Sequence, residues 1–487
     1  MSPIFQIDSA DPDSPLRLRK KTKIVATLGP ASDSPEVMRA MFEAGVNVCR
    51  FNMSHGTHAE HLARLQQVRR ISQELDRPVA VLVDLQGPKI RTGRLKDNAP
   101  VEWRVGEPTI ITVADCPEGT AERVGTTYAG LAEDVKSGDV ILVDDGRMRL
   151  RVEAVQGQDV HCRIEIGGLL KNNKGMNLPG VKVGVSSLSE KDKADLAWAI
   201  EQDVDFIALS FVRNARDVRH LKNRIGETGH AIPVIAKVER AEAVENIDEI
   251  LAEADGIMVA RGDLGVEISI PVLPIVQKDL ILRANRLGKS VITATQMLES
   301  MIEGDIPSRA EATDIANAVF DGTDAVMLSG ETTVGKNPVR VVQAMSSILL
   351  EAERSRYLPG EQLDTRATTF SPICMTVSRA ADLMCRDLEA EAIMVFSKGT
   401  EMGLLLSKQR NRTSMIVVCQ DERTWRAHCL IWGIAAVLVP PQHDLQDLLE
   451  SGIESAIAHK FVRDGQRVVV AYGFPEQGVV HVKLHRV

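Results

Sequence analysis

Residues 233–265 read PVIAKVERAEAVENIDEILAEADGIMVARGDLG. Two short apolar runs, Pro233–Val238 and Gly256–Ala260, lie on either side of a helical stretch. Strands that alternate with helical stretches are typical of βα units and a parallel sheet. The stretch therefore predicts parallel strands joined by helices.

The same pattern recurs along most of the chain. Eight βα units predict an α/β fold built on a closed TIM (β/α)8 barrel, whose chemistry lies at the C-terminal ends of the strands. Ser187-Leu-Ser-Glu190 is interpreted as a capping box before the helical stretch DKADLAWAIEQ. The predicted strands are Lys23–Leu28, Val46–Asn52, Val79–Leu85, Phe206–Val212, Pro233–Val238, Gly256–Ala260, Ser290–Thr295 and Ala325–Leu328.

A long insertion follows the third predicted strand, because roughly a hundred residues separate Leu85 from Ser187. Short strands punctuated by Gly and Asp, such as Met148–Val155 and Val160–Ile166, predict an inserted all-β domain. Because it leaves the barrel at the C-terminal end of a strand, it could cover the active site as a lid. A decorative insertion is the alternative.

A charged connection, ERSRYLPGEQLDTR, follows Leu350, and new strand-like runs come after it. They predict a separate α/β domain. The predicted division is a first barrel part with a short N-terminal extension (1–86), a β-barrel lid domain (87–184), a second barrel part (185–350) and a C-terminal α/β domain (351–487).

Composition narrows the class of protein. The net charge of −9 gives no general attraction to nucleic acid or anionic membranes. Seven cysteines without a C-x-x-C pattern indicate reduced thiols in a cytosolic chain. The N-terminal residues lack the apolar core of a secretory signal, and the longest apolar run is too short to span a membrane. The basic run from Arg17 to Lys23 is predicted to be a solvated entry to the first strand, with anion binding as the alternative.

Charged side chains follow the fifth and sixth predicted strands. Lys237 and Glu239 are two residues apart, so they point to the same side of an extended segment. Asp263 follows the next strand, and Gly262 allows close backbone approach to a ligand. Glu239 and Asp263 could share one Mg²⁺, which commonly binds one or two carboxylates plus substrate oxygens. A structural ion pair is the alternative.

Other strand ends carry polar groups as well. Arg50, Asn52 and Ser54 alternate onto one face, and Arg50 could bind a phosphate or carboxylate with two hydrogen bonds. Next to Gly56, His55 could equally cap a turn. The remaining candidates at the mouth are Asp84, Lys89, Arg91 and Thr295, and Glu331 is interpreted as an ordinary polar strand end. No P-loop pattern occurs, so nucleotide phosphates would need the metal, side chains and the lid.

Several of these stretches together resemble the pyruvate kinase family, in its bacterial form. They include TKIVATLGPAS, CRFNMSHG, DLQGPKIRTG, AKVERAEAVENIDEI, MVARGDLGVE and TATQMLESM, in order from Thr22 to about Pro338. The C-terminal domain resembles the family more loosely. The resemblance implies transfer of a phosphoryl group from phosphoenolpyruvate to ADP, giving pyruvate and ATP, as the last step of glycolysis.

The resemblance also implies roles for single residues. Arg50 would contact the transferring phosphoryl group, and Lys237 would stabilise its transition-state charge. Glu239 and Asp263 would hold Mg²⁺ or Mn²⁺. The backbone of Arg261, Gly262 and Asp263 would bind the substrate carboxylate, and Thr295 would lie near the carbon that gains a proton. The nucleotide would be bound by Arg91, Lys174, Asn52 and His55. A monovalent-cation pocket would be formed by Asn52, Ser54 and Asp84.

K⁺ is expected to be dispensable. Family members that need K⁺ carry Thr and Glu at the positions of Leu85 and Lys89. The ammonium of Lys89 could replace the ion, and a solvated charge at the base of the lid is the alternative.

The C-terminal domain is implied to regulate and to oligomerise. The resemblance implies a cytoplasmic homotetramer and an allosteric site. Ser397, Lys398, Gly399 and Thr400 could hold one phosphate. Glu401 and the loop around Glu476 oppose a second phosphate, so fructose 1,6-bisphosphate is not expected to activate. The alternative is a domain that binds nothing and only builds the oligomer.

Two rival functions share the features at the strand ends. One is a Mg²⁺-dependent aldolase or lyase that acts on pyruvate, against which Arg91 and Lys174 argue as a nucleotide clamp. The other is a non-catalytic metabolite sensor, against which the intact catalytic set argues.

Overall fold

The computed structural model describes residues 20–487 except 185, 361–362, 365–367, 397 and 475–478. Eight parallel strands close into a barrel, which confirms the predicted fold class. Around the barrel their order is β1, β16, β15, β14, β13, β12, β3 and β2. Their bounds are β1 Lys23–Thr27, β2 Val48–Asn52, β3 Ala80–Asp84, β12 Phe206–Leu209, β13 Val234–Val238, β14 Gly256–Ala260, β15 Ser290–Ala294 and β16 Ala325–Leu328.

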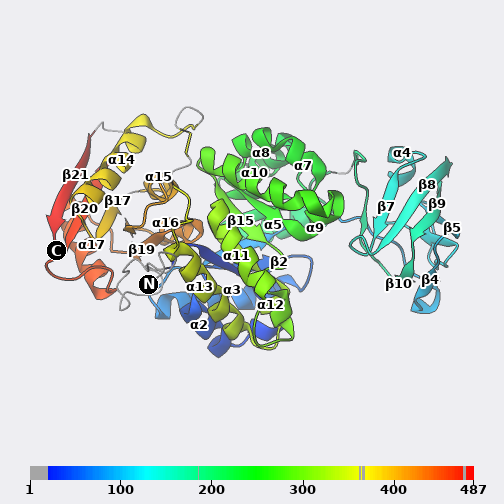
Figure 1. Ribbon diagram of the computed structural model, residues 1–487, viewed down its shortest axis with the longest axis horizontal. Coiled ribbons are helices and arrows are strands. Elements are labelled where there is room, and N and C mark those ends of the chain that lie inside the picture. The colour runs from blue at the N-terminus through cyan, green and yellow to red at the C-terminus, as the bar shows by residue number, and fades with distance from the viewer. Residues whose placement is uncertain (1–19, 185, 361–362, 365–367, 397, 475–478) are drawn as a thin grey trace.

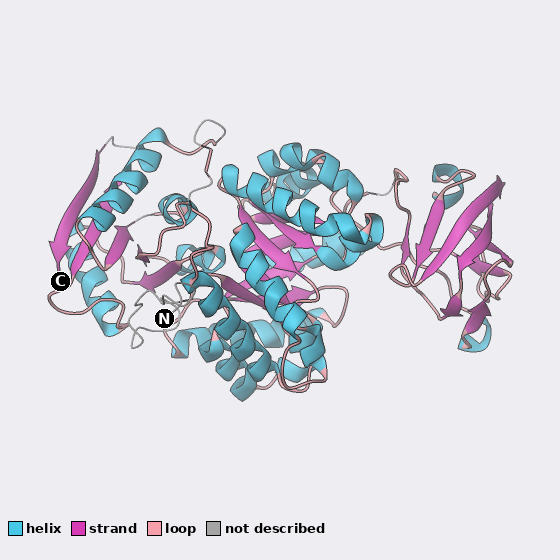
Figure 2. Cartoon of the chain, viewed as in Figure 1, coloured by secondary structure: helices cyan, strands magenta, loops and turns pink. Residues whose placement is uncertain are grey.

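Helices surround these strands (Figure 2). The strands are buried on both sides, and their apolar side chains belong to one continuous core with the helices and to a second cluster centred on Val25 and Met258. The helices are α2 Pro35–Ala44, α3 His58–Glu74, α5 Glu190–Glu201, α6 Ala215–Gly226, α7 Ala241–Glu245, α8 Ile247–Glu253, α9 Arg261–Glu267, α10 Leu273–Arg286, α11 Arg309–Asp321, α12 Gly330–Thr333 and α13 Pro338–Arg354.

Between β3 and β12 the chain forms a separate β unit, called the lid below, with its own core around Trp103. Its sheet has the order β11, β7, β8, β9, β5, β6, and β10 pairs with β4. Figure 1 shows this unit at one end of the molecule, beyond the barrel. Its elements are β4 Val101–Trp103, β5 Pro108–Thr112, β6 Arg123–Gly125, α4 Leu131–Asp134, β7 Val140–Val143, β8 Met148–Gln156, β9 Asp159–Ile166, β10 Gly168–Leu170 and β11 Met176–Asn177.

The C-terminal part is a five-stranded sheet flanked by helices, at the opposite end of the molecule from the lid (Figure 1). Its strand order is β19, β18, β17, β20, β21, and only β21 is antiparallel to its neighbour. The elements are α14 Pro372–Asp387, β17 Ala392–Phe396, α15 Glu401–Lys408, β18 Ser414–Cys419, α16 Glu422–Ala427, β19 Ile434–Leu438, α17 Leu445–Ala458, β20 Arg467–Phe474 and β21 Val479–Arg486. Short 3-10 turns lie at Pro30–Ser32, Lys96–Asn98, Ile270–Val272, Glu299–Ile302 and His428–Leu430. No described helix is long and apolar enough to cross a membrane.

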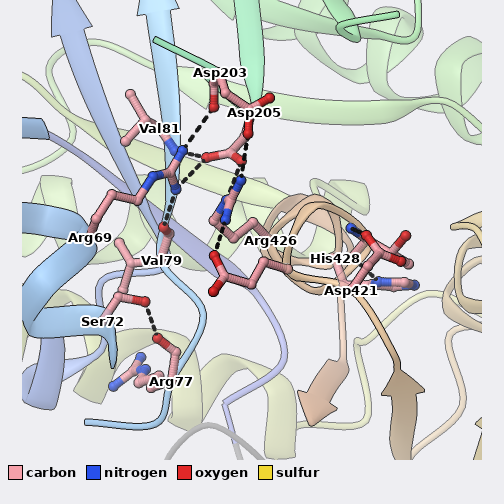
Figure 3. Close-up of polar contacts among 12 residues, drawn as sticks. Arg69, Ser72, Arg77, Val79, Val81, Asp203, Asp205, Asp421, Arg426 and His428 are labelled. Carbon is pink, nitrogen blue, oxygen red and sulfur yellow. Dashed lines mark hydrogen bonds and ion pairs between the residues drawn. The ribbon is translucent and has the colours of Figure 1, made fainter. Parts of the chain in front are cut away.

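Buried ion pairs join the C-terminal part to the base of the barrel (Figure 3). Arg426 on α16 donates from Nε to Asp205 Oδ1 at 2.6 Å, directly before β12. The other oxygen of Asp205 accepts from Arg69 at 2.9 Å and from the backbone N–H of Val81 at 2.7 Å. One carboxylate therefore connects three segments that are distant in sequence.

The expectation of a solvated basic entry is wrong for Lys20, Lys21 and Lys23, which are 2%, 8% and 3% exposed. Lys21 donates to the backbone oxygen of Thr413 at 2.7 Å, and Lys23 donates to that of Ile434 at 2.6 Å. Because burial outweighs the attraction of Glu353, it lowers the pKa of Lys21 to about 8. Lys21 and Lys23 fasten the first strand to the C-terminal part, and Arg17 and Arg19 lie outside the described residues.

The predicted capping box is also wrong by two residues. Helix α5 begins at Glu190 and is capped by Ser189, whose hydroxyl accepts from the N–H of Asp192. Asp192 returns the bond to the N–H of Ser189 at 2.9 Å. Ser187 lies outside this pair, because the capping residue must directly precede the first helical residue.

Candidate active site

Strands β2, β3 and β13 bring four charged side chains together at their C-terminal ends. Arg50 Nε donates to Asp84 Oδ2 at 2.7 Å, and a second guanidinium nitrogen lies 2.6 Å from the same oxygen. Lys237 Nζ lies 3.2 Å from Asp84 Oδ1 and 2.8 Å from Glu239 Oε1. The alternation along β13 explains the last contact, because residues two apart point the same way.

Two residues directly after β12, Ser210 and Phe211, complete this cluster and were not among the predicted site residues. Ser210 Oγ accepts from Lys237 Nζ at 2.7 Å and donates to the backbone oxygen of Leu85 at 2.7 Å. The N–H of Phe211 donates to Glu239 Oε2 at 2.7 Å, from a backbone with φ +54°. A polar residue at the end of a predicted barrel strand was the available signal for Ser210.

The charges of this cluster are set by burial and by their neighbours. Burial alone would lower the pKa of Lys237, but Asp84 and Glu239 outweigh it and raise that pKa above its ordinary value. Burial would raise the pKa of Asp84, yet Lys237 and Arg50 bring it below the ordinary value. Lys237 is therefore a fixed positive charge at neutral pH.

Glu239 and Asp263 are the candidate metal ligands. Burial, reinforced by the charge of Asp263, raises the pKa of Glu239 to about 7 even though Lys237 acts in the opposite direction. Such an excess of negative charge between two carboxylates suits a hard divalent cation. Among the described residues no group of three or more His, Cys, Asp or Glu could hold a metal. The remaining ligands would have to be substrate or water oxygens.

The candidate carboxylate site lies at the start of α9, beside the end of β15. The N–H of Gly262 donates to Thr295 Oγ1 at 2.7 Å. Thr295 has φ +71°, a strained conformation for a β-branched residue that is found mostly where a site requires it. The side chain of Arg261 turns away from the mouth to Asp314 at 2.7 Å, so only its backbone could face a substrate there.

A cleft separates the lid from the barrel mouth, and Asp263 lines it. Lys89 lines the same cleft, and within the described part of the chain no hydrogen bond or ion pair joins its side chain to Asp84, Asn52 or Ser54. Lys174 lies in the lid, where Asp144 binds its ammonium at 2.7 Å. The cleft is lined by Pro88, Lys89, Ile90, Asp145, Gly175, Met176, Asn177, Leu178, Val183, Phe211, Arg213, Arg240 and Asp263.

Three other candidate residues, Asn52, His55 and Arg91, form hydrogen bonds with protein groups. Asn52 is paired in register with Asp84, and its side-chain oxygen accepts from the N–H of Ser54 at 3.1 Å. The backbone oxygen of His55 lies 2.9 Å from His61 Nε2. Arg91 begins the lid, where its N–H donates to Thr127 Oγ1 at 2.9 Å.

Glu331 and the loop before α15 are the remaining candidates. Glu331 is buried and accepts from the backbone N–H groups of Leu298 at 3.1 Å and Ser329 at 2.7 Å, consistent with a structural role. Lys398, Gly399 and Thr400 precede α15 in the C-terminal part, and Ser397 lies outside the described residues.

Comparisons with known proteins agree along most of the chain. A family model described as pyruvate kinase, barrel domain, matches residues 19–342, and one described as pyruvate kinase, alpha/beta domain, matches residues 375–487. A pyruvate kinase of Corynebacterium glutamicum is 42% identical over 474 residues, covering 96% of this chain and 98% of that protein. Pyruvate kinase 2 of Synechocystis is 43% identical over 460 residues, covering 94% and 77%. A crystal structure of a pyruvate kinase from Cryptosporidium parvum superposes with a TM-score of 0.89 at 32% identity, covering 97% of both chains.

Proposed function

The chain belongs to the pyruvate kinase family, a family of phosphotransferases, and from this premise we propose that it transfers the phosphoryl group of phosphoenolpyruvate to ADP, giving pyruvate and ATP in glycolysis. The observation that carries the proposal is the charged Lys237, held between Asp84 and Glu239 at the barrel mouth. Phosphoryl transfer depends mostly on positioning and on electrostatic stabilisation of the moving group. A buried, fixed cation supplies such stabilisation.

The roles of the other residues follow from their places. Arg50, already oriented by Asp84, would bind an oxygen of the phosphoryl group. Glu239 and Asp263 would hold the divalent cation that the family requires, which supplies positive charge at the substrate oxygens. We propose Mg²⁺ or Mn²⁺, because both carboxylates offer hard oxygen ligands.

The start of α9 would bind the carboxylate of the substrate. The backbone from Arg261 to Asp263 would face the mouth, where Gly262 would leave room for close approach. Its N–H is bonded to Thr295 Oγ1, so the arriving carboxylate would share or displace that bond. Thr295, thus held beside the substrate, would lie near the carbon that accepts the proton.

The lid would bind the nucleotide. Arg91 and Lys174 belong to it, and both would reach ADP phosphates across the cleft, with Asn52 and His55 on the barrel side. Lys174 would exchange its bond with Asp144 for a phosphate. A lid that clamps a nucleotide favours the kinase over an aldolase or lyase.

We propose that the lid domain spans residues 87–184 and that the C-terminal domain spans residues 351–487.

A pyruvate-forming assay tests the proposal. Purified protein should form pyruvate only when phosphoenolpyruvate, ADP and a divalent cation are all present, and a chelator should abolish the reaction. Pyruvate formation without ADP would favour a lyase, and no turnover at all would favour the sensor.

We propose further that K⁺ is not required, because Lys89 follows Asp84 closely in sequence and brings a positive charge to the cleft. We expect full turnover in a buffer of tetramethylammonium salts. Lys89→Glu should then become K⁺-dependent or inactive, whereas Lys96→Glu, in an exposed turn of the lid, should behave like the parent. Negligible turnover of the parent protein without K⁺ would refute the idea.

The C-terminal part is proposed to take one phosphate, from a monophosphorylated sugar or nucleotide. Lys398, Gly399 and Thr400 offer an ammonium, backbone N–H groups and a hydroxyl. Glu401 follows and accepts from the N–H of Ser371 at 2.8 Å, so its negative charge is held at this loop. Fructose 1,6-bisphosphate, with two phosphates, should leave the half-saturating phosphoenolpyruvate concentration unchanged in a steady-state titration. A large decrease would overturn this prediction.

We also propose a cytoplasmic homotetramer. Large apolar side chains on the barrel surface, Ile270, Ile275 and Ile306, are 74%, 66% and 71% exposed in the single chain. Apolar residues of this kind are expected at subunit contacts. Sedimentation velocity would measure the mass of the assembly.

A further inference from the structure

The segment by which the chain returns from the lid to the barrel is held by two barrel arginines. Arg213 donates from Nη1 to the backbone oxygen of Val183 at 2.7 Å. Arg240 donates from Nη2 to the backbone oxygen of Val181 at 3.2 Å. The side chains of Val181 and Val183 are buried in the lid core. The return segment therefore packs with the lid through its side chains and bonds to the barrel through its carbonyl groups.

Arg213 is a rigid donor because Asp217 holds it. Its Nε and Nη2 donate to the two oxygens of Asp217 at 3.1 and 3.0 Å, and its backbone N–H donates to the same carboxylate at 3.0 Å. Two parallel bonds to one carboxylate fix the plane of a guanidinium. The side chain of Asn246 also donates to the backbone oxygen of Arg213 at 3.0 Å. These bonds fix the position of Nη1 without any contribution from the lid.

Arg240 depends on the lid for its hydrogen bonding. The guanidinium is buried, and its Nε has no hydrogen-bond partner among the described residues. Glu242 approaches that nitrogen only to 3.6 Å. Among the described residues, the bond from Nη2 to the carbonyl of Val181 is therefore the one hydrogen bond of this guanidinium. Because losing it would leave a further buried donor without an acceptor, which is costly, that carbonyl favours the conformation in which the lid lies on the barrel.

Both arginines follow the strand ends that carry the reacting groups. Arg240 follows Glu239 directly, and Arg213 comes two residues after Phe211, whose N–H binds Glu239. Both guanidinium groups line the cleft together with Asp263. A displacement of the return segment would therefore move the lid close to the site where ADP would bind.

We propose that Arg213 and Arg240 are positioning residues that fasten the return segment of the lid to the barrel and so set the position of the lid over the cleft. This inference rests on the proposed function for its kinetic consequence. The nucleotide would bind lid and barrel together, whereas phosphoenolpyruvate would bind the barrel alone. Losing either arginine should therefore weaken ADP binding far more than phosphoenolpyruvate binding.

The test uses Arg213→Met and Arg240→Met in the full chain, with Arg213→Lys and Arg240→Lys as conservative variants. Arg219→Met is the matched control, because Arg219 lies on α6 with 53% of its side chain exposed and bonds only to Glu253 among the described residues. We expect each Met variant to raise KM for ADP by about tenfold, the scale of one lost charged hydrogen bond. KM for phosphoenolpyruvate should change by less than about threefold on the same scale, and the Lys variants should recover part of the ADP affinity.

A second measurement does not depend on activity. Amide hydrogen exchange of residues 178–184 in the substrate-free protein should accelerate in both Met variants and stay at the parental rate in Arg219→Met. Parental exchange in the Met variants would overturn the inference whatever the enzyme catalyses. Accelerated exchange in a protein that forms no pyruvate would support the fastening of the return segment by Arg213 and Arg240 and would refute the proposed function. Equal changes of both KM values would also contradict the proposed positioning role.

Discussion

Lys237→Ala should lose at least ~10²–10³ in turnover, the usual cost of removing one preorganised electrostatic contact. Lys237 Nζ lies between Asp84 and Glu239, at 3.2 and 2.8 Å, and both carboxylates keep it charged. Its charge matters most while the phosphoryl group moves from phosphoenolpyruvate to ADP and negative charge develops on the enolate oxygen that it leaves. Binding of phosphoenolpyruvate should therefore weaken much less than turnover.

Steady-state kinetics and a direct binding titration check this expectation. The chain should still fold, because Arg50 continues to neutralise Asp84, and circular dichroism can verify it. Lys193→Ala provides a control on the surface of α5, where Lys193 pairs with Glu190. Near-normal turnover of Lys237→Ala would refute the mechanism.

Asp205→Asn should lower the free energy of unfolding by about 3–5 kcal/mol, the scale for breaking a buried ion pair by removing one partner. Its carboxylate is the common acceptor for Arg426, Arg69 and the N–H of Val81. An amide keeps the shape but leaves Arg69 without a carboxylate partner among the described residues, and leaves Arg426 with only the more exposed Asp203 and Glu422. Because Arg426 belongs to the C-terminal part, contact between the two parts should weaken as well.

Asp203→Asn is the matched control. Asp203 binds the same Arg426 at 3.2 Å, but its side chain is 60% exposed, so its loss should cost about 1 kcal/mol or less. Its backbone has φ +47°, a conformation that Asn tolerates. Urea unfolding followed by tryptophan fluorescence compares the two variants. Equal stabilities would show that the buried carboxylate has no special role.

The proximity of the four charged side chains at the barrel mouth could be predicted from sequence because their geometry is local. Lys237 and Glu239 share one side of β13 by the alternation of a strand, and parallel strands in a barrel end at one rim. This rule brings Arg50 and Asp84 to the same place. Ser210 follows the same rule but was missed, because one serine in a mainly apolar run carries little signal.

Contacts between distant segments could not be predicted in this way. The burial of Lys21 and Lys23 depends on carbonyl groups 392 and 411 residues further along the chain. The partner of Lys174 is Asp144, whose proximity depends on how the lid sheet folds. Local sequence patterns do not indicate which distant residues pair, whereas the barrel as a whole is predicted by a repeated local βα unit.

Phosphorus NMR of a mixture of phosphoenolpyruvate, ADP, Mg²⁺ and the purified protein tests the central claim most directly. The account predicts that the phosphoenolpyruvate resonance disappears as the three ATP resonances grow in equal amount, and that Lys237→Ala slows both changes together. Release of inorganic phosphate in place of ATP, or an unchanged spectrum, would contradict it.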